Sequence, residues 1–186
     1  MTFRAFISVD VEVQSKLEEF WEKLKGSNAP MKLVELENIH MTLKFLGDTD
    51  EKLIDDIAGV MALSVESTEP FTVELKGTGA FPNLNYMKVI WVGLENAEGL
   101  VDIAKTLNRE LEKLGFQKEK KGFRPHVTLA RVKGARNKNR VQEILREYEK
   151  ETFSSQRVEC IRLKKSVLSG KGPTYTTVKE VKFPGT

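Results

Sequence analysis

Four stretches of the chain carry apolar residues at the spacing of one face of an α-helix. They are residues 17–24, 53–61, 100–114 and 141–148. The first helix is expected to end at Gly26, and Asp50 and Asn139 are suited to cap the second and the fourth. The sequence therefore predicts four amphipathic helices.

Extended segments lie between these helices. Apolar runs, most of them alternating with polar residues, predict strands at residues 3–9, 32–47, 71–81, 88–94, 123–132, 157–168 and 175–183. Gly47 and Asp48 are expected to form a turn, and Pro82 is expected to end a strand. Each half of the chain thus reads strand, helix, strand, helix, strand, with one extra strand in the second half.

The two halves share a short motif. His40-Met-Thr-Leu and His126-Val-Thr-Leu stand 86 residues apart in a chain of 186 residues. Such a repeat indicates a duplicated unit. We therefore expect an α+β fold with two pseudo-symmetric duplicated lobes, each a small sheet with two helices, around a central cleft. The chain is expected to be a single bilobal domain over residues 1–186, with lobe halves of roughly 1–87 and 88–186, and exchange of strands between the lobes is left open.

Composition limits the class of protein. Hydrophobic residues make up 40% of the chain and charged residues 31%, which is typical of a core-forming protein. The single cysteine, Cys160, excludes a disulfide framework and is expected to be a small buried hydrophobe. The first ten residues do not resemble a signal peptide, and no apolar run approaches the roughly 18 residues of a membrane span. We therefore expect a cytoplasmic protein without a membrane partner, and the abundance of Lys and Glu is typical of hyperthermophile proteins.

The only two histidines occupy the two repeated motifs. In a strand, residues i and i+2 share a face, so His40 lies beside Thr42 and His126 beside Thr128. Two imidazoles facing one cleft suit in-line displacement at phosphorus, with one acting as base and the other as acid. The threonine hydroxyls could then bind the phosphate oxygens. The two motifs are nearly interchangeable, so the sequence does not determine which histidine is the acid.

The chain resembles the two-histidine phosphoesterases, and closely the RNA 2′,3′-cyclic phosphodiesterases, also called 2′-5′ RNA ligases. The resemblance spans the whole chain and rests on the segments RAFISVD, HMTLKFLG, GTGAFPN and RPHVTLAR. It implies that His40 is the proton donor, that His126 is the proton acceptor, and that Thr42, Thr128 and Arg131 bind the substrate. It also implies a metal-independent hydrolase without a cofactor, which opens a cyclic phosphate at an RNA end, such as that of a tRNA fragment, to a 2′-phosphate. The resemblance also leaves open a reversible, ATP-independent 2′-5′ RNA ligation, and a monomer is expected.

Arg131 presents a geometrical difficulty. Strict alternation along a strand places Arg131 on the face opposite to His126 and Thr128. For Arg131 to reach the phosphate, the strand must therefore end, twist or bulge between Thr128 and Arg131.

The net charge of +3 conceals a strong local imbalance. Between Lys118 and Arg140 there are nine Lys and Arg residues and one Glu, whereas the rest of the chain carries a net negative charge. A basic segment beside a phosphate-chemistry motif favours contact with an RNA backbone. The aromatic residues that could stack on an unpaired terminal base are Phe6, Phe45, Phe81, Tyr86 and Phe123.

Two other functions remain open at this point. A metal hydrolase could use the two histidines with a carboxylate such as Glu37 or Asp48, although no familiar ligand spacing is present. A non-catalytic RNA-end binding module would explain the basic segment equally well, but it has no need of two groups that titrate near neutral pH. Gly77-Thr-Gly79 lacks the residues of a phosphate-binding loop and is expected to be a turn or bulge in a strand.

Overall fold

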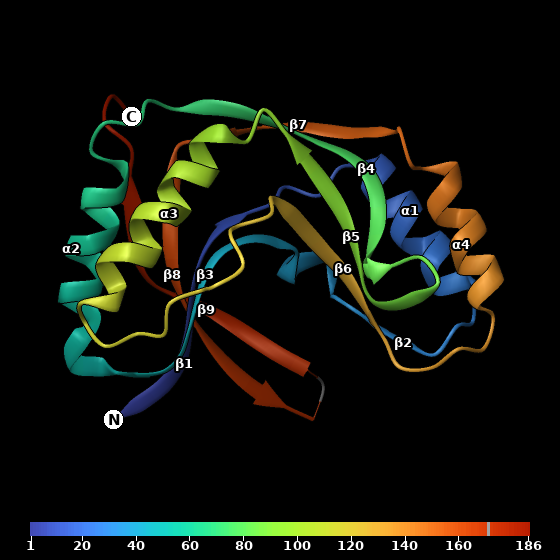
Figure 1. Cartoon of the computed structure of the whole chain (residues 1–186), viewed down its shortest axis with the longest axis horizontal. Helices are drawn as coiled ribbons and strands as arrows, with labels where there is room; N and C mark the ends of the chain where they lie inside the picture. Colours follow the sequence, from blue (N-terminus) through green and yellow to red (C-terminus); the bar gives the residue numbers. More distant parts are fainter. Residues whose placement is uncertain (171) are drawn as a thin grey trace.

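The strands and helices form two antiparallel sheets, each covered by two helices (Figure 1). The computed structural model describes residues 1–170 and 172–186. The strands are β1 (Thr2–Asp10), β2 (Met31–Leu33), β3 (His40–Asp50), β4 (Phe71–Asn83), β5 (Tyr86–Glu95), β6 (His126–Val132), β7 (Thr152–Val158), β8 (Cys160–Ser169) and β9 (Gly172–Lys182). The α-helices are α1 (Ser15–Gly26), α2 (Ile54–Val65), α3 (Glu98–Glu112) and α4 (Lys138–Glu147). The expected α+β fold class is confirmed.

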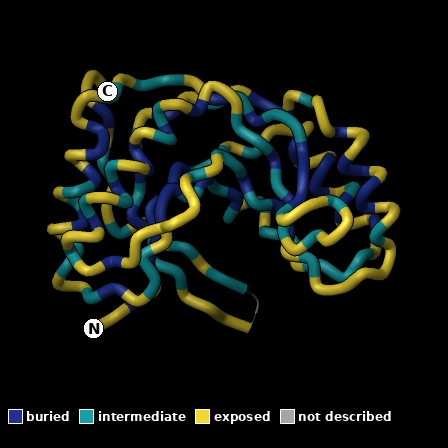
Figure 2. The backbone as a smooth tube through the Cα atoms, viewed as in Figure 1, coloured by how far each residue is buried: buried dark blue, intermediate teal, exposed yellow. Residues whose placement is uncertain are grey.

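The four-stranded sheet has the order β3-β1-β8-β9, and the five-stranded sheet has the order β2-β6-β5-β4-β7. Helices α2 and α3 pack together against the four-stranded sheet, whereas α1 and α4 lie against the five-stranded sheet. The buried faces of the sheets and helices contribute to the hydrophobic core, and the outer faces of the helices are exposed (Figure 2). This is the amphipathic pattern that the sequence predicts.

The division between the two sheets does not follow the division between residues 1–87 and 88–186. Strands β2 and β4 of the first half belong to the five-stranded sheet, and β8 and β9 of the second half belong to the four-stranded sheet. Helices exchange in the same way, because α1 packs with α4 and α2 packs with α3. Each lobe, which consists of one sheet and its two helices, is therefore built from both halves of the chain.

The segment 32–47 is not one continuous strand. A short 3₁₀ helix, Leu36–Asn38, separates β2 from β3, and this break lets the chain pass from one sheet to the other. Gly47 and Asp48 do not form a turn, because β3 continues through them to Asp50. Gly47 has a φ of 70° and lies beside a shift in the pairing of β1 with β3, a position that favours glycine.

Three other boundaries differ from the predictions. Pro82 lies inside β4, beyond the part that pairs with β7, and its missing N–H is tolerated at this sheet edge. The segment 157–168 is divided at Glu159 into β7 and β8, which belong to different sheets. Asn137, not Asn139, precedes α4, and its side chain donates to backbone carbonyls at the end of α1.

Two residues named from the sequence can be placed here. The carboxylate of Asp50 accepts a hydrogen bond of 3.0 Å from the backbone N–H of Lys52, so Asp50 caps the 3₁₀ turn Glu51–Leu53 that leads into α2. Cys160 is half-buried at the start of β8 and is not the fully buried residue that was expected. Within the described residues, no helix is long and apolar enough to cross a membrane.

Candidate active site

The two histidine motifs lie on β3 and β6, which belong to different sheets and are in contact. The segment before His40 holds them together. Strand β2 pairs with β6, and the N–H of Val34 then donates to the carbonyl of Leu129 over 2.8 Å. The chain next passes through the 3₁₀ helix and enters β3 at His40. The path of the backbone thus brings two motifs that are far apart in sequence to the junction of the sheets.

A register shift occurs at the leucine of each motif. The pairing of β1 with β3 steps from Ile7–Lys44 to Ser8–Thr42 and skips Leu43. Both leucines are buried, as the sequence predicts, whereas the histidine and threonine of each motif are half-buried on the other face.

The bulge in β6 explains how Arg131 reaches the face of His126. The pairing of β5 with β6 steps from Ile90–Ala130 to Trp91–Thr128 and leaves Leu129 as an extra residue. Burial along the strand shifts accordingly, because Leu129 and Ala130 are both buried and Arg131 is exposed. A bulge is one of the irregularities in the strand that allow Arg131 to share the face of His126 and Thr128.

Both histidines use the same ring nitrogen in the same hydrogen bond. Nδ1 of His40 lies 2.6 Å from the carbonyl oxygen of Asn38, and Nδ1 of His126 lies 2.6 Å from that of Arg124. A carbonyl oxygen only accepts hydrogen bonds, so Nδ1 carries the hydrogen in each ring. Nε2 is therefore the nitrogen that can exchange a proton with a ligand.

The surroundings of the rings favour the neutral imidazole. Burial lowers the pKa of His126, and the hydrogen bond to the Arg124 carbonyl opposes this in part. Burial likewise lowers the pKa of His40, opposed by the carbonyl of Asn38 and by the negative charge of Asp10, while Lys164 acts in the same direction as burial. Both histidines therefore hold a proton less readily than a free imidazole does.

Aromatic rings border both histidines. The centroid of the His40 ring lies 4.9 Å from the centroid of the Phe6 ring. It lies 5.4 Å from the centroid of the Tyr175 ring, and these two rings meet edge to face. The ring of His126 lies 5.1 Å, edge to face, from that of Phe81. Burial raises the pKa of the Tyr175 hydroxyl, and the positive charge of Arg131 opposes this rise in part. Tyr175 of β9 is thus close to groups from both motifs.

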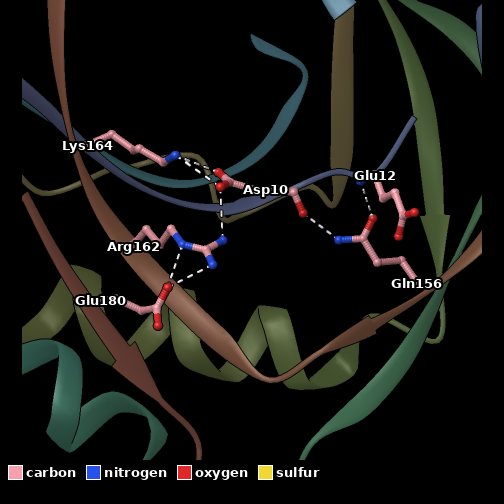
Figure 3. Close-up of polar contacts among 6 residues, drawn as sticks. All are labelled: Asp10, Glu12, Gln156, Arg162, Lys164 and Glu180. Atoms are coloured by element: carbon pink, nitrogen blue, oxygen red, sulfur yellow. Dashed lines mark hydrogen bonds and ion pairs between the residues drawn. The ribbon is translucent and has the colours of Figure 1, made fainter. Parts of the chain in front are cut away.

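A charged network lies on the His40 side of the site (Figure 3). Asp10 accepts from Arg162 Nη1 and from Lys164 Nζ, each over 2.9 Å, and Arg162 also pairs with Glu180 of β9 over 2.8 Å. Sequence reasoning missed this network and Tyr175. Alternation in β1 would have placed Phe6, Ser8 and Asp10 on one face, but the pairing of β1 with β3 and β8 could not be read from the sequence.

The other sequence candidates have different environments. Phe45 is 58% exposed and occupies the position in β3 that Arg131 occupies in β6. Phe6 is buried, and Tyr86 lies at the exposed β4–β5 hairpin. Among the described residues, no group of three His, Cys, Asp or Glu side chains could hold a metal ion, so neither Glu37 nor Asp48 completes such a site.

Comparison with known proteins gives consistent matches over most of the chain. A model of the 2′-5′ RNA ligase superfamily matches residues 13–166. An RNA 2′,3′-cyclic phosphodiesterase of Methanothermobacter thermautotrophicus is 38% identical over 181 residues, which is 96% of this chain and 98% of the relative. One of Aeropyrum pernix is 42% identical over 168 residues, 90% of this chain and 94% of the relative.

Solved structures share the fold. A crystal structure of a Thermus thermophilus protein superposes with a TM-score of 0.76 at 27% identity and covers 98% of both chains. The structure of E. coli LigT with 3′-AMP gives a TM-score of 0.74 at 20% identity and covers 99% of both chains. At that identity, the second likeness concerns the fold alone.

Proposed function

This chain belongs to the 2′-5′ RNA ligase superfamily and is a phosphodiesterase, and we propose that it opens a 2′,3′-cyclic phosphate at an RNA 3′ end to leave a 2′-phosphate. The observation that carries the proposal is the matched pair of histidines. Each Nδ1 is occupied by a backbone carbonyl two residues earlier, so each Nε2 is left to exchange protons. Relatives with 38% and 42% identity are named RNA 2′,3′-cyclic phosphodiesterases.

In the proposed reaction, His126 acts as base and His40 as acid. Nε2 of His126 takes a proton from water, and the water oxygen forms a bond to phosphorus. The bond between phosphorus and the 3′ oxygen breaks in line, and protonated His40 gives its Nε2 proton to that oxygen. Each proton transfer is expected to contribute about 10²–10⁴-fold to the rate. Exchange with solvent then restores both histidines.

Thr42, Thr128 and Arg131 are proposed to bind the non-bridging phosphate oxygens. Each threonine shares a strand face with its histidine, and the bulge at Leu129 supports the same placement for Arg131. A guanidinium provides charge-assisted hydrogen bonds to phosphate and stabilises the charge that develops at phosphorus. Exposed Phe45 is the aromatic residue that best suits stacking on the terminal base.

The proposed substrate is RNA, and tRNA fragments are among the RNAs that carry such an end. The nine Lys and Arg residues between Lys118 and Arg140 surround the His126 motif in sequence, and nearly all of them are exposed. They would contact the RNA backbone. If an RNA 5′-hydroxyl replaced water as the nucleophile, a 2′-5′ link would form with both histidines in the same roles, and they would exchange roles only in the reverse cleavage of that link. A monomer is proposed as well, because the contact between β3 and β6 brings the two histidine motifs together without a second chain.

The proposal is tested by the single variants His40→Ala and His126→Ala, with folding checked by circular dichroism. We expect each variant to bind an RNA ending in cyclic phosphate and to lose at least about 10²-fold in turnover. If both variants retained wild-type turnover, the two-histidine mechanism would be wrong. If the wild type bound the RNA end tightly and showed no turnover, the non-catalytic binding module would be favoured.

A further inference from the structure

The two histidines have equivalent backbones but different neighbours on the adjacent strand. Asp10 is the cross-strand partner of His40 in the pairing of β1 with β3. Gly93 is the corresponding partner of His126 in the pairing of β5 with β6. Cross-strand partners share a face and lie close together. A carboxylate therefore accompanies one histidine of the pair, whereas the other has a residue without a side chain.

We propose that Asp10 makes the two histidines unequal by holding the proton on His40, so that His40 is the donor. The inference rests on the proposed function for its catalytic meaning. Asp10 would be a positioning residue, because it acts through His40 and not on the substrate.

The surroundings of Asp10 hold its carboxylate and backbone in place. Its carboxylate accepts hydrogen bonds from Arg162 and Lys164 of β8, and its backbone carbonyl accepts one from the side chain of Gln156 in β7 (Figure 3). The side chain of Lys164 is 13% exposed and that of Asp10 is 44% exposed, so the contact lies at the border between the protein interior and the solvent. Charge-assisted hydrogen bonds from two cations fix the orientation of a carboxylate.

The charges that act on His40 are those of Asp10 on β1 and Lys164 on β8. Arg162 of β8 and Glu180 of β9 belong to the same network of ion pairs through Asp10, and Tyr175 of β9 contacts the imidazole ring. Asp10 attracts the proton of His40 more strongly than Lys164 repels it, and both effects are smaller than the effect of burial. Asp10 thus offsets part of the burial that would otherwise keep His40 neutral.

The inference can be tested without substrate by NMR titration of the imidazole protons. The chain has two histidines, so the spectrum contains two ring systems, which His→Ala variants assign. We expect Asp10→Asn to lower the pKa of His40 by about half a unit or more and to leave His126 unchanged. Lys164→Met should move the pKa of His40 upward. The matched control Glu180→Gln removes a carboxylate from the same network without removing the partner of His40, and it should shift His40 by less than half as much.

The two hypotheses fail in different ways. If Asp10→Asn left the titration of His40 unchanged, or shifted both histidines equally, Asp10 would not distinguish them, whatever the protein does to RNA. If the wild type did not turn over cyclic-phosphate RNA, the proposed function would fail while the titration still reported the effect of Asp10. If Asp10→Asn does not fold, Lys164→Met still tests the inference, because it should raise the pKa of His40. An unchanged or lowered pKa of His40 in Lys164→Met would contradict the inference.

Discussion

Leu43 and Leu129 are the extra residues of two matching β-bulges, one in each strand that carries a histidine. Each bulge changes the third side chain on the face of the histidine, which is five residues after the histidine and not four, as strict alternation would place it. In β3 the third residue is Phe45, and in β6 it is Arg131. The duplicated backbone thus presents an apolar ring beside one histidine and a cation beside the other.

The position of Arg131 predicts that its charge matters for turnover. Arg131→Gln should lower kcat/KM for a 2′,3′-cyclic phosphate by about 10²-fold, because it removes a donor that stabilises charge on phosphorus. Steady-state kinetics with a cyclic mononucleotide would measure this. The matched control is Lys133→Gln, which removes an exposed positive charge two residues away and should change kcat/KM by less than about threefold. Equal losses in the two variants would mean that only the general positive field is important.

The assignment of acid and base predicts a selective rescue. A substrate with sulfur in place of the 3′ bridging oxygen has a leaving group that needs little protonation, because a thiol is far more acidic than an alcohol. The defect of His40→Ala should therefore shrink from at least about 10²-fold with oxygen to less than about tenfold with sulfur. His126→Ala should be impaired equally on both substrates. Rescue of His126→Ala instead would reverse the assignment.

The burial of both imidazoles predicts the pH dependence of the reaction. The base must be neutral, so activity falls when the pH drops below its pKa, and the acid must be protonated, so activity falls when the pH rises above its pKa. Burial lowers the pKa of each histidine from its usual value. The profile of kcat/KM should therefore be bell-shaped, with its maximum on the acid side of about pH 6.5. A rate that rose continuously from about pH 5 to pH 9 would be incompatible with two histidines in these roles.

Lys44 predicts a stability effect that is separate from catalysis. The residue is 2% exposed, and Nζ donates to Asn108 Oδ1 over 2.8 Å and to the Gln117 carbonyl over 2.6 Å. Lys44→Met would leave these acceptors with fewer donors and should lower the free energy of unfolding by about 1–3 kcal/mol in urea denaturation. Exposed Lys105 on α3 is the control, and Lys105→Met should change stability by less than about 0.5 kcal/mol. Equal stability of the Lys44 variant and the wild type would show that this contact contributes nothing.

The local pattern of the sequence was sufficient for part of the site. Alternation places Leu43 and Leu129 toward the core and the histidines and threonines on the other face, and the structure agrees. The same reasoning identified the irregularity that Arg131 needs. These relations involve residues a few positions apart, where the strand repeat determines direction.

Relations between distant strands could not be obtained in this way. The pattern of β2 does not reveal that this strand joins the sheet of β6, and the run through Glu159 does not reveal that β7 and β8 separate into different sheets. Asp10 and Tyr175 were missed for the same reason, since each meets His40 only through the order of the strands. Strand pairing depends on the packing of the whole chain and not on a local repeat.

Metal-independent opening of the cyclic phosphate by two histidines is best tested by incubating the protein with a short RNA that ends in a 2′,3′-cyclic phosphate, with excess EDTA present throughout. The position of the phosphate in the product would be assigned by NMR. We expect turnover to the 2′-phosphate at a rate that EDTA does not change. Absence of turnover, with activity restored by an added divalent ion, would contradict the two-histidine mechanism and favour a metal hydrolase.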